Sequence, residues 1–227
     1  CVNPHLEYHH FDPPWHIEQH HDPDRMIALC ATHHAKADAW TTEQVRKLKG
    51  EARLMAGVGG RFEWMRDDVL AVVGGNYYYE TPKMVVFREQ PLIWFERDDE
   101  RRLLLNVNML SASGEPRTSL ENNDWFLRGE PEDVESPRNG SSLRVRYANG
   151  DDVSVRFREW SDAQALGRAH DRALVLGDEL FFPLVTAEVS LAVGGTDVRF
   201  GPKETRLCGI TITGSVMSHC GAGLAFG

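Results

Sequence analysis

Short runs of apolar residues dominate the chain beyond residue 60. They occupy residues 61–66, 69–73, 83–88, 91–96 and 103–110, and Gly, Pro, Asn or Asp residues separate them. Runs of this length, rich in Val, Ile, Phe and Trp and bounded by turn-forming residues, are typical of strands. The pattern predicts a mainly β domain over residues 61–227.

Before residue 57 the apolar period is that of a helix. Its apolar positions recur at i, i+3, i+7 and i+10: Val45, Leu48, Ala52 and Met55. Thr41 or Thr42 is expected to start this helix, and Thr41 and Gln44 have the spacing of a capping box. A Gly-rich linker, residues 57–60, follows. We therefore expect two domains, at residues 1–57 and 61–227.

The clearest β-hairpin is predicted within residues 143–160. Its two alternating apolar sets are Leu143, Val145 and Tyr147, and Val153, Val155 and Phe157. A three-residue loop, Ala148–Gly150, keeps both sets on one face, with Gly150 left-handed and Arg146 opposite Asp152. The opposite, solvated face then carries four arginines: Arg144, Arg146, Arg156 and Arg158. These form a soluble surface or a contact for nucleic acid.

A short helix over residues 161–173, capped by Ser161, is expected next, followed by strands at 173–176 and 180–193. The predicted fold class is α+β. We expect the β domain to pack as a sandwich or a small open barrel, and less readily as a β-solenoid.

Composition sets limits on function. The 227 residues are 41% hydrophobic and carry a formal charge of −9, which argues against a protein that coats nucleic acid nonspecifically but leaves room for a local basic groove. The sequence has no membrane-spanning apolar run and no signal pattern, so we expect a cytoplasmic protein without a membrane partner. The predicted β domain lacks a nucleophile elbow, a P-loop and a dinucleotide fingerprint.

Histidine is concentrated at the start of the chain, where eight of the ten histidines fall within the first 34 residues. Cys30 and His33 form a CxxH pair, and Cys1 is a third soft ligand, so the spacing indicates a structural zinc. Because the chain starts at a cysteine rather than at methionine, we expect further residues upstream, with the fourth ligand a cysteine a few positions before Cys1.

The order of these features resembles the HNH endonuclease family in its zinc-stabilised treble-clef form. A cysteine is followed by a strand ending in His9-His10, a variable stretch, the strand Met26-Ile27-Ala28-Leu29, and then Cys30-x-x-His33-His34. The resemblance covers about residues 1–40. It implies a ββα-metal site, in which two strands and a helix hold one divalent ion beside the scissile phosphate.

The resemblance also implies roles for individual residues. His9 would bind the ion, His10 would be the general base and His34 a second ligand, so that the three rings lie around a single cation. Asp38, four residues beyond His34 on the same helical face, could complete the coordination. The ion would be Mg²⁺, Mn²⁺ or a transition metal.

At one position the sequence departs from the family. Arg25 stands five residues before Cys30, where the family has its central Asn. Arginine cannot bind a cation, but it could contact the substrate phosphate or the charge of the transition state. The leading hypothesis is therefore an active metal-dependent DNA endonuclease, in bacterial defence or a mobile element. The alternative is a noncatalytic, zinc-stabilised DNA-binding or assembly protein with a degenerate HNH module.

DNA is the expected partner. The helix predicted to start at Thr41 or Thr42 has a cationic stripe of Arg46, Lys49 and Arg53. This stripe is either a solvated face or a guide for DNA phosphates. We expect His5, His16, His20 and His21 to be surface or loop residues, and Trp15 to be a packing anchor rather than a base-stacking platform. The sequence leaves the ligand of the β domain and the number of subunits open, a homo-oligomer included.

Overall fold

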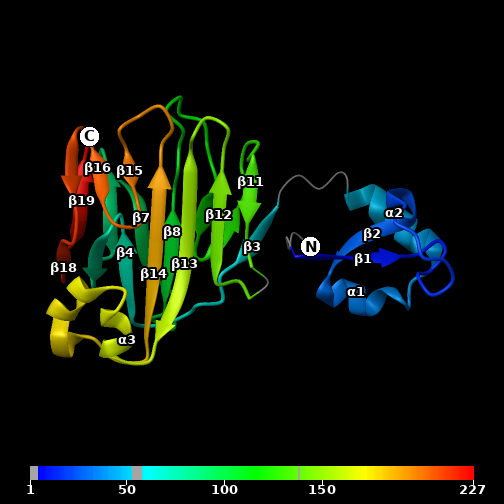
Figure 1. Cartoon of the computed structure of the whole chain (residues 1–227), viewed down its shortest axis with the longest axis horizontal. Coiled ribbons are helices and arrows are strands. Elements are labelled where there is room, and N and C mark those ends of the chain that lie inside the picture. The colour runs from blue at the N-terminus through cyan, green and yellow to red at the C-terminus, as the bar shows by residue number, and fades with distance from the viewer. Residues whose placement is uncertain (1–4, 53–57, 138) are drawn as a thin grey trace. The chain divides into compact units, whose positions relative to one another are not determined.

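The computed structural model describes residues 5–52, 58–137 and 139–227. The chain divides into two compact units, Cys1–Gly60 and Arg61–Gly227. The first contains the histidines of interest, and the second contains most of the strands (Figure 1).

The N-terminal unit is built on a two-stranded antiparallel sheet. Strand β1 (Leu6–His10) pairs with β2 (Met26–Cys30), so that His10 lies opposite Met26 and Leu6 opposite Cys30. A 3-10 helix, Pro23–Arg25, precedes β2. Helix α1 (Ala31–Ala37) begins directly after β2, and α2 (Thr42–Ala52) follows. The chain thus has a strand, strand, helix order around the paired histidines.

The capping box of α2 forms as predicted. The Gln44 backbone N–H donates to Thr41 Oγ1 (3.2 Å), and the Thr41 N–H donates to Gln44 Oε1 (2.8 Å). Val45 is buried with Phe11 and Ile27 in a small core. The predicted apolar stripe is wrong at Leu48, which is 38% exposed and does not belong to this core. The Ala52 side chain and Met55 lie outside the described residues.

The second unit contains a seven-stranded and a ten-stranded sheet. The seven-stranded sheet has the order β19-β6-β7-β8-β9-β10-β3. Its strands are β3 (Gly59–Arg61), β6 (Lys83–Phe87), β7 (Gln90–Arg97), β8 (Leu103–Val107), β9 (Ser119–Glu121), β10 (Asp124–Phe126) and β19 (Ala222–Phe226).

The ten-stranded sheet runs β11-β12-β13-β14-β15-β16-β17, with β4, β5 and β18 joined to it through β14. Its strands are β4 (Val69–Val73), β5 (Asn76–Tyr79), β11 (Asp133–Glu135), β12 (Ser142–Arg146), β13 (Asp152–Trp160), β14 (Leu184–Ala192), β15 (Arg199–Phe200), β16 (Thr205–Leu207), β17 (Ile210–Ile212) and β18 (Val216–Ser218). Strand β4 pairs with β14 in parallel, which joins segments far apart in the sequence.

Both sheets contribute to one core. Leu105 and Trp125 from the seven-stranded sheet lie in the same buried cluster as Val155 and Val189 from the ten-stranded sheet. Neither sheet closes on itself in the described residues. The expectation of an α+β, mainly β protein is therefore confirmed.

The predicted hairpin is confirmed with its register. Val145 lies opposite Val153 and Arg146 opposite Asp152 across β12 and β13, and Gly150 has a φ of +88°. The inward-facing side chains of both strands are buried. The loop length therefore sets which face of each strand enters the core.

The segment after β13 differs from the prediction. Helix α3 is short (Ala163–Gly167), and Asp162 rather than Ser161 caps it by accepting the Ala165 N–H at 2.8 Å. The predicted strand 173–176 lies in a 3-10 helix, Asp171–Glu179. Its Ala173 and Leu176 side chains pack on a second core at the outer face of the ten-stranded sheet, where a helical turn buries both.

None of the helices in the described residues has the length and apolar character needed to cross a membrane.

Candidate active site

His9 and His34 meet in the N-terminal unit. Their ring centroids are 5.5 Å apart and the rings are nearly perpendicular, at 86°. His9 lies on β1, and His34 is on α1, which starts immediately after β2. The chain passes directly from β2 into α1 at Cys30. This tight turn places His34 over β1, the strand that pairs with β2.

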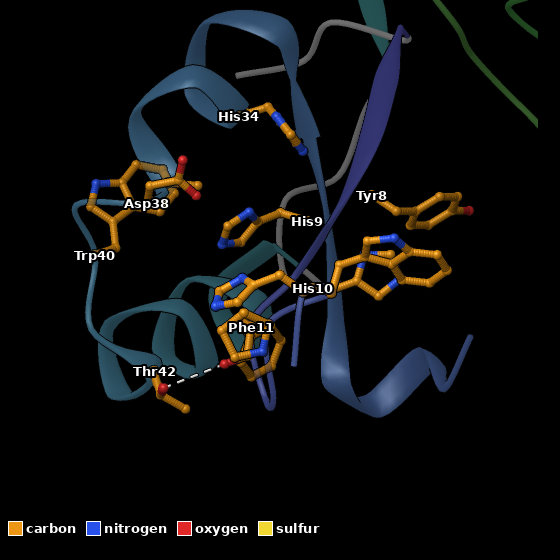
Figure 2. Close-up of a pocket in the computed structure, with 12 residues that line it drawn as sticks. Tyr8, His9, His10, Phe11, His34, Asp38, Trp40 and Thr42 are labelled. Atoms are coloured by element: carbon orange, nitrogen blue, oxygen red, sulfur yellow. Dashed lines mark hydrogen bonds between the residues drawn. The ribbon is translucent and has the colours of Figure 1, made fainter. Parts of the chain in front are cut away.

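Asp38 borders the same cavity. It forms the C-terminal cap of α1 and, with His9 and His34, lines a cavity of about 700 Å³. Figure 2 shows these three side chains on one side of β1 and Tyr8 on the other. Burial and the nearby His34 lower the pKa of His9, and the Asp38 charge partly offsets this. A lowered pKa favours the neutral imidazole, which is the form that binds a metal.

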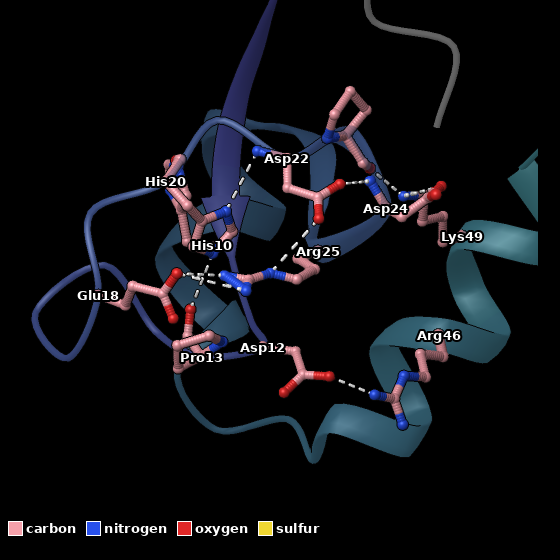
Figure 3. Close-up of polar contacts among 11 residues, drawn as sticks. His10, Asp12, Pro13, Glu18, His20, Asp22, Asp24, Arg25, Arg46 and Lys49 are labelled. Carbon is pink, nitrogen blue, oxygen red and sulfur yellow. Dashed lines mark hydrogen bonds and ion pairs between the residues drawn. The ribbon is translucent and has the colours of Figure 1, made fainter.

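His10 is oriented by different neighbours, because successive side chains of a strand point to opposite faces. The centroid of its ring lies 4.6 Å from that of the Trp15 ring and 5.0 Å from that of the His20 ring. His10 Nε2 is 2.9 Å from the backbone carbonyl oxygen of His20 (Figure 3). A carbonyl only accepts, so Nε2 donates this hydrogen bond, and in the neutral ring Nδ1 then has the lone pair. This is the tautomer of a positioned general base.

The predicted convergence of three rings is observed for two of them. His9 and His34 adjoin, whereas the His10 ring contacts Trp15, His20 and His21. No group of three or more His, Cys, Asp or Glu side chains is placed to hold a metal ion within residues 5–52, 58–137 and 139–227. Two imidazoles and a carboxylate around one cavity do provide the donor chemistry of a divalent-ion site. Full coordination would require side-chain rotation.

The CxxH pair is in contact. Cys30 Sγ lies 3.0 Å from His33 Nδ1, and Cys30 is buried. Hydrogen bonds from the His33 backbone and ring lower the pKa of the Cys30 thiol, which favours the thiolate that zinc binds. The third predicted ligand, Cys1, lies outside the described residues.

Arg25 is held by two acidic side chains. Its Nη2 donates to Glu18 Oε1 at 2.8 Å, and its Nε lies 3.6 Å from Asp22 Oδ2 (Figure 3). Both partners come from the connection between β1 and β2. The guanidinium thus fastens this connection, and a phosphate would have to compete with two carboxylates for it.

The cations predicted to guide DNA also have intramolecular partners. Arg46 pairs with Asp12, and Lys49 donates to the Pro23 carbonyl and lies 4.0 Å from Asp24 (Figure 3). Arg53 lies outside the described residues. These contacts fasten α2 to the β1–β2 connection and leave fewer free donors for phosphate than the sequence alone indicated.

Two functional contacts were missed at the sequence level. His20 was expected to be a solvated loop residue, yet its backbone carbonyl orients His10. Glu7 Oε2 lies 3.7 Å from His34 Nδ1 and could steady that ring. A signal existed for Glu7, since alternation along β1 places it on the His9 face. The His20 backbone carbonyl has no sequence signal, because every residue type has a backbone carbonyl.

Comparison of the chain with protein-family models, curated proteins and solved structures gave no match.

Proposed function

We propose that this chain is a metal-dependent DNA endonuclease of the HNH type. The observation that carries the proposal is the meeting of His9 and His34 at 5.5 Å beside a cavity that Asp38 and His10 also line. The strand, strand, helix order around these residues matches the ββα arrangement that the motif implies.

The side chains divide into two roles. His9 and His34, with Asp38, would hold a divalent ion, which supplies a Lewis acid for the phosphate oxygen and the leaving alkoxide. His10, with Nε2 committed to the His20 carbonyl, accepts a proton from water through Nδ1. Its position on the other face of β1 suits a base, which needs to reach the attacking water rather than bind the ion.

A second function is favoured by specific observations. Arg25 replaces the central Asn of the motif and is engaged with Glu18 and Asp22. No three-ligand group forms within the described part of the chain. Both features fit a noncatalytic, zinc-stabilised module for DNA binding or assembly, in which Cys30 and His33 keep a structural role.

Cleavage of supercoiled plasmid separates the two functions. We expect the wild-type chain to nick plasmid with Mg²⁺, Mn²⁺ or a transition metal and to stop when a chelator is added. His10→Ala should lower the rate by roughly 10²–10⁴-fold, because the base is lost.

The matched control is His219→Asn, which removes an exposed imidazole of the second unit. Residue 219 has a positive φ, which Asn tolerates. This variant should cut at the wild-type rate. Absence of cutting across all metals, with His10→Ala indistinguishable from wild type, would favour the noncatalytic function instead.

A further inference from the structure

The two faces of the β1–β2 sheet are covered to different extents. On one face, Ile27 packs with Phe11 and with helix α2 in the small core. Because side chains alternate along a strand, the opposite face presents Leu6, Tyr8 and His10 from β1. Tyr8 is 67% exposed and Leu6 is 48% exposed. The described residues of this unit therefore leave the second face largely uncovered, and we call it the open face.

Two exposed aromatic side chains lie near His10 on the open face. Tyr8 is two residues away on β1, about 7 Å along the strand, and points to the side opposite His34 (Figure 2). The centroid of the Trp15 ring is 4.6 Å from that of His10, and Trp15 is 40% exposed. Tyr8, His10 and Trp15 also line the cavity of the candidate active site. Trp15, which was expected to be only a packing anchor, thus presents part of its ring there.

Exposed aromatic rings at such a cavity are suited to unpaired bases. Stacking of a base on an aromatic side chain contributes about 1–3 kcal/mol and requires that the face of the base be accessible. In a duplex, neighbouring base pairs already cover these faces. A single strand can turn its bases toward Tyr8 and Trp15 while its backbone passes beside His10.

The charges around the site favour the same ligand. Duplex binding depends on Lys and Arg side chains that replace the counterions of closely spaced phosphates. Here Arg25 pairs with Glu18, Arg46 pairs with Asp12, and the chain has a formal charge of −9. Binding of a single strand depends less steeply on such cations and draws more on stacking.

We propose that the open face binds single-stranded DNA, with bases stacked on Tyr8 and Trp15, and this rests on the endonuclease function proposed above. Because both rings lie near His10, stacking would also bring a phosphate to the proposed general base. Negative supercoiling promotes local strand opening, so the plasmid of the cleavage assay also offers unpaired segments.

Fluorescence anisotropy of the full chain, with a labelled single-stranded oligonucleotide and with its duplex, tests this. The buffer contains a chelator, so that binding is measured without cutting. We expect the single strand to bind at least about tenfold more tightly than the duplex. Tyr8→Leu and Trp15→Leu should each weaken single-strand binding about tenfold, because one stacked base is lost. Tyr8→Phe and Trp15→Phe keep a ring and should bind like wild type.

Ile17→Ala is the matched control, because Ile17 is exposed in the β1–β2 connection but does not line the cavity. Its affinity should equal that of wild type, and circular dichroism checks that each variant folds. Ring-dependent binding by a chain that cuts no plasmid would support the open face as a single-strand site and refute only the endonuclease function.

Three results would overturn the proposal. The first is a duplex that binds as tightly as the single strand. The second is unchanged single-strand binding by the Tyr8→Leu/Trp15→Leu double variant. The third is self-association that Tyr8→Leu abolishes, without single-strand binding, which would assign the open face to a second copy of the chain.

Discussion

The buried carboxylate of Asp68 receives little stabilisation from its neighbours. It directly precedes β4, and neither carboxylate oxygen has a hydrogen-bond partner among the described residues. Burial is the largest effect and raises the pKa of this carboxyl, the neighbouring Tyr79 hydroxyl partly offsets it, and the nearby Glu80 charge raises the pKa further. The folded state therefore holds the Asp68 proton more tightly than the unfolded state. The associated stability is present below the ordinary aspartate pKa and is lost as pH rises through the raised value.

The Asp68→Asn variant tests this. At pH 7 its free energy of unfolding should exceed that of wild type by about 1 kcal/mol, because a buried charge is replaced by a neutral amide. Near pH 4 the difference should shrink, because the raised pKa makes Asp68 take up its proton at a higher pH than an ordinary aspartate. Urea unfolding at both pH values measures it, with the exposed Asp67→Asn as control. Destabilisation by Asp68→Asn at pH 7 would show that the carboxylate has a stabilising partner.

For single residues of the candidate site, the sequence predicted some of the contacts but not all of them. The CxxH contact follows from spacing, since Cys30 and His33 flank the first turn of a helix. The turning of His10 away from His9 follows from strand alternation, which the expectation of three converging rings overlooked. The ion pairs of Arg25 could not be read from sequence, because its partners depend on how the β1–β2 connection folds back.

Among the elements, α2 depends on its capping box. Thr41→Ala removes the acceptor of the Gln44 N–H and should destabilise the helix by about 1 kcal/mol. Hydrogen exchange of the α2 amides, followed by mass spectrometry in the full chain, should accelerate about fivefold.

Gln44→Ala removes the reciprocal contact. The double variant should lose less stability of α2 than the two single variants lose together, because the two hydrogen bonds form one motif. Strictly additive effects would mean that Thr41 and Gln44 act separately.

Elements with local signals were predicted well. The 143–160 hairpin was predicted with its register, because turn length and alternation fix it within a few residues. The 3-10 helix Asp171–Glu179 was mistaken for a strand, because its short apolar run is compatible with either state. Packing against Leu70 and Trp160 of the outer-face core decides between them, and that contact is nonlocal.

For the whole molecule, the change of apolar period near residue 57 predicted two parts, and the structure has compact units Cys1–Gly60 and Arg61–Gly227. The strand order could not be predicted. The parallel pairing of β4 with β14 joins Val69–Val73 to a strand more than a hundred residues later. No local pattern encodes such a pairing, because it depends on which surfaces remain uncovered once the hairpins have formed.

We propose that His9 and His34 bind an ion while His10 acts beside it as a base. Mn²⁺ titration of the full chain, followed by loss of the free-ion signal in electron paramagnetic resonance, tests it most directly, since Mn²⁺ has little affinity for the Cys30 thiolate. We predict one bound Mn²⁺ per wild-type chain, loss of binding in His9→Ala and in His34→Ala, and retention in His10→Ala. A wild-type chain that binds no Mn²⁺, or a His10→Ala variant that loses the ion as completely as His9→Ala, would contradict the account.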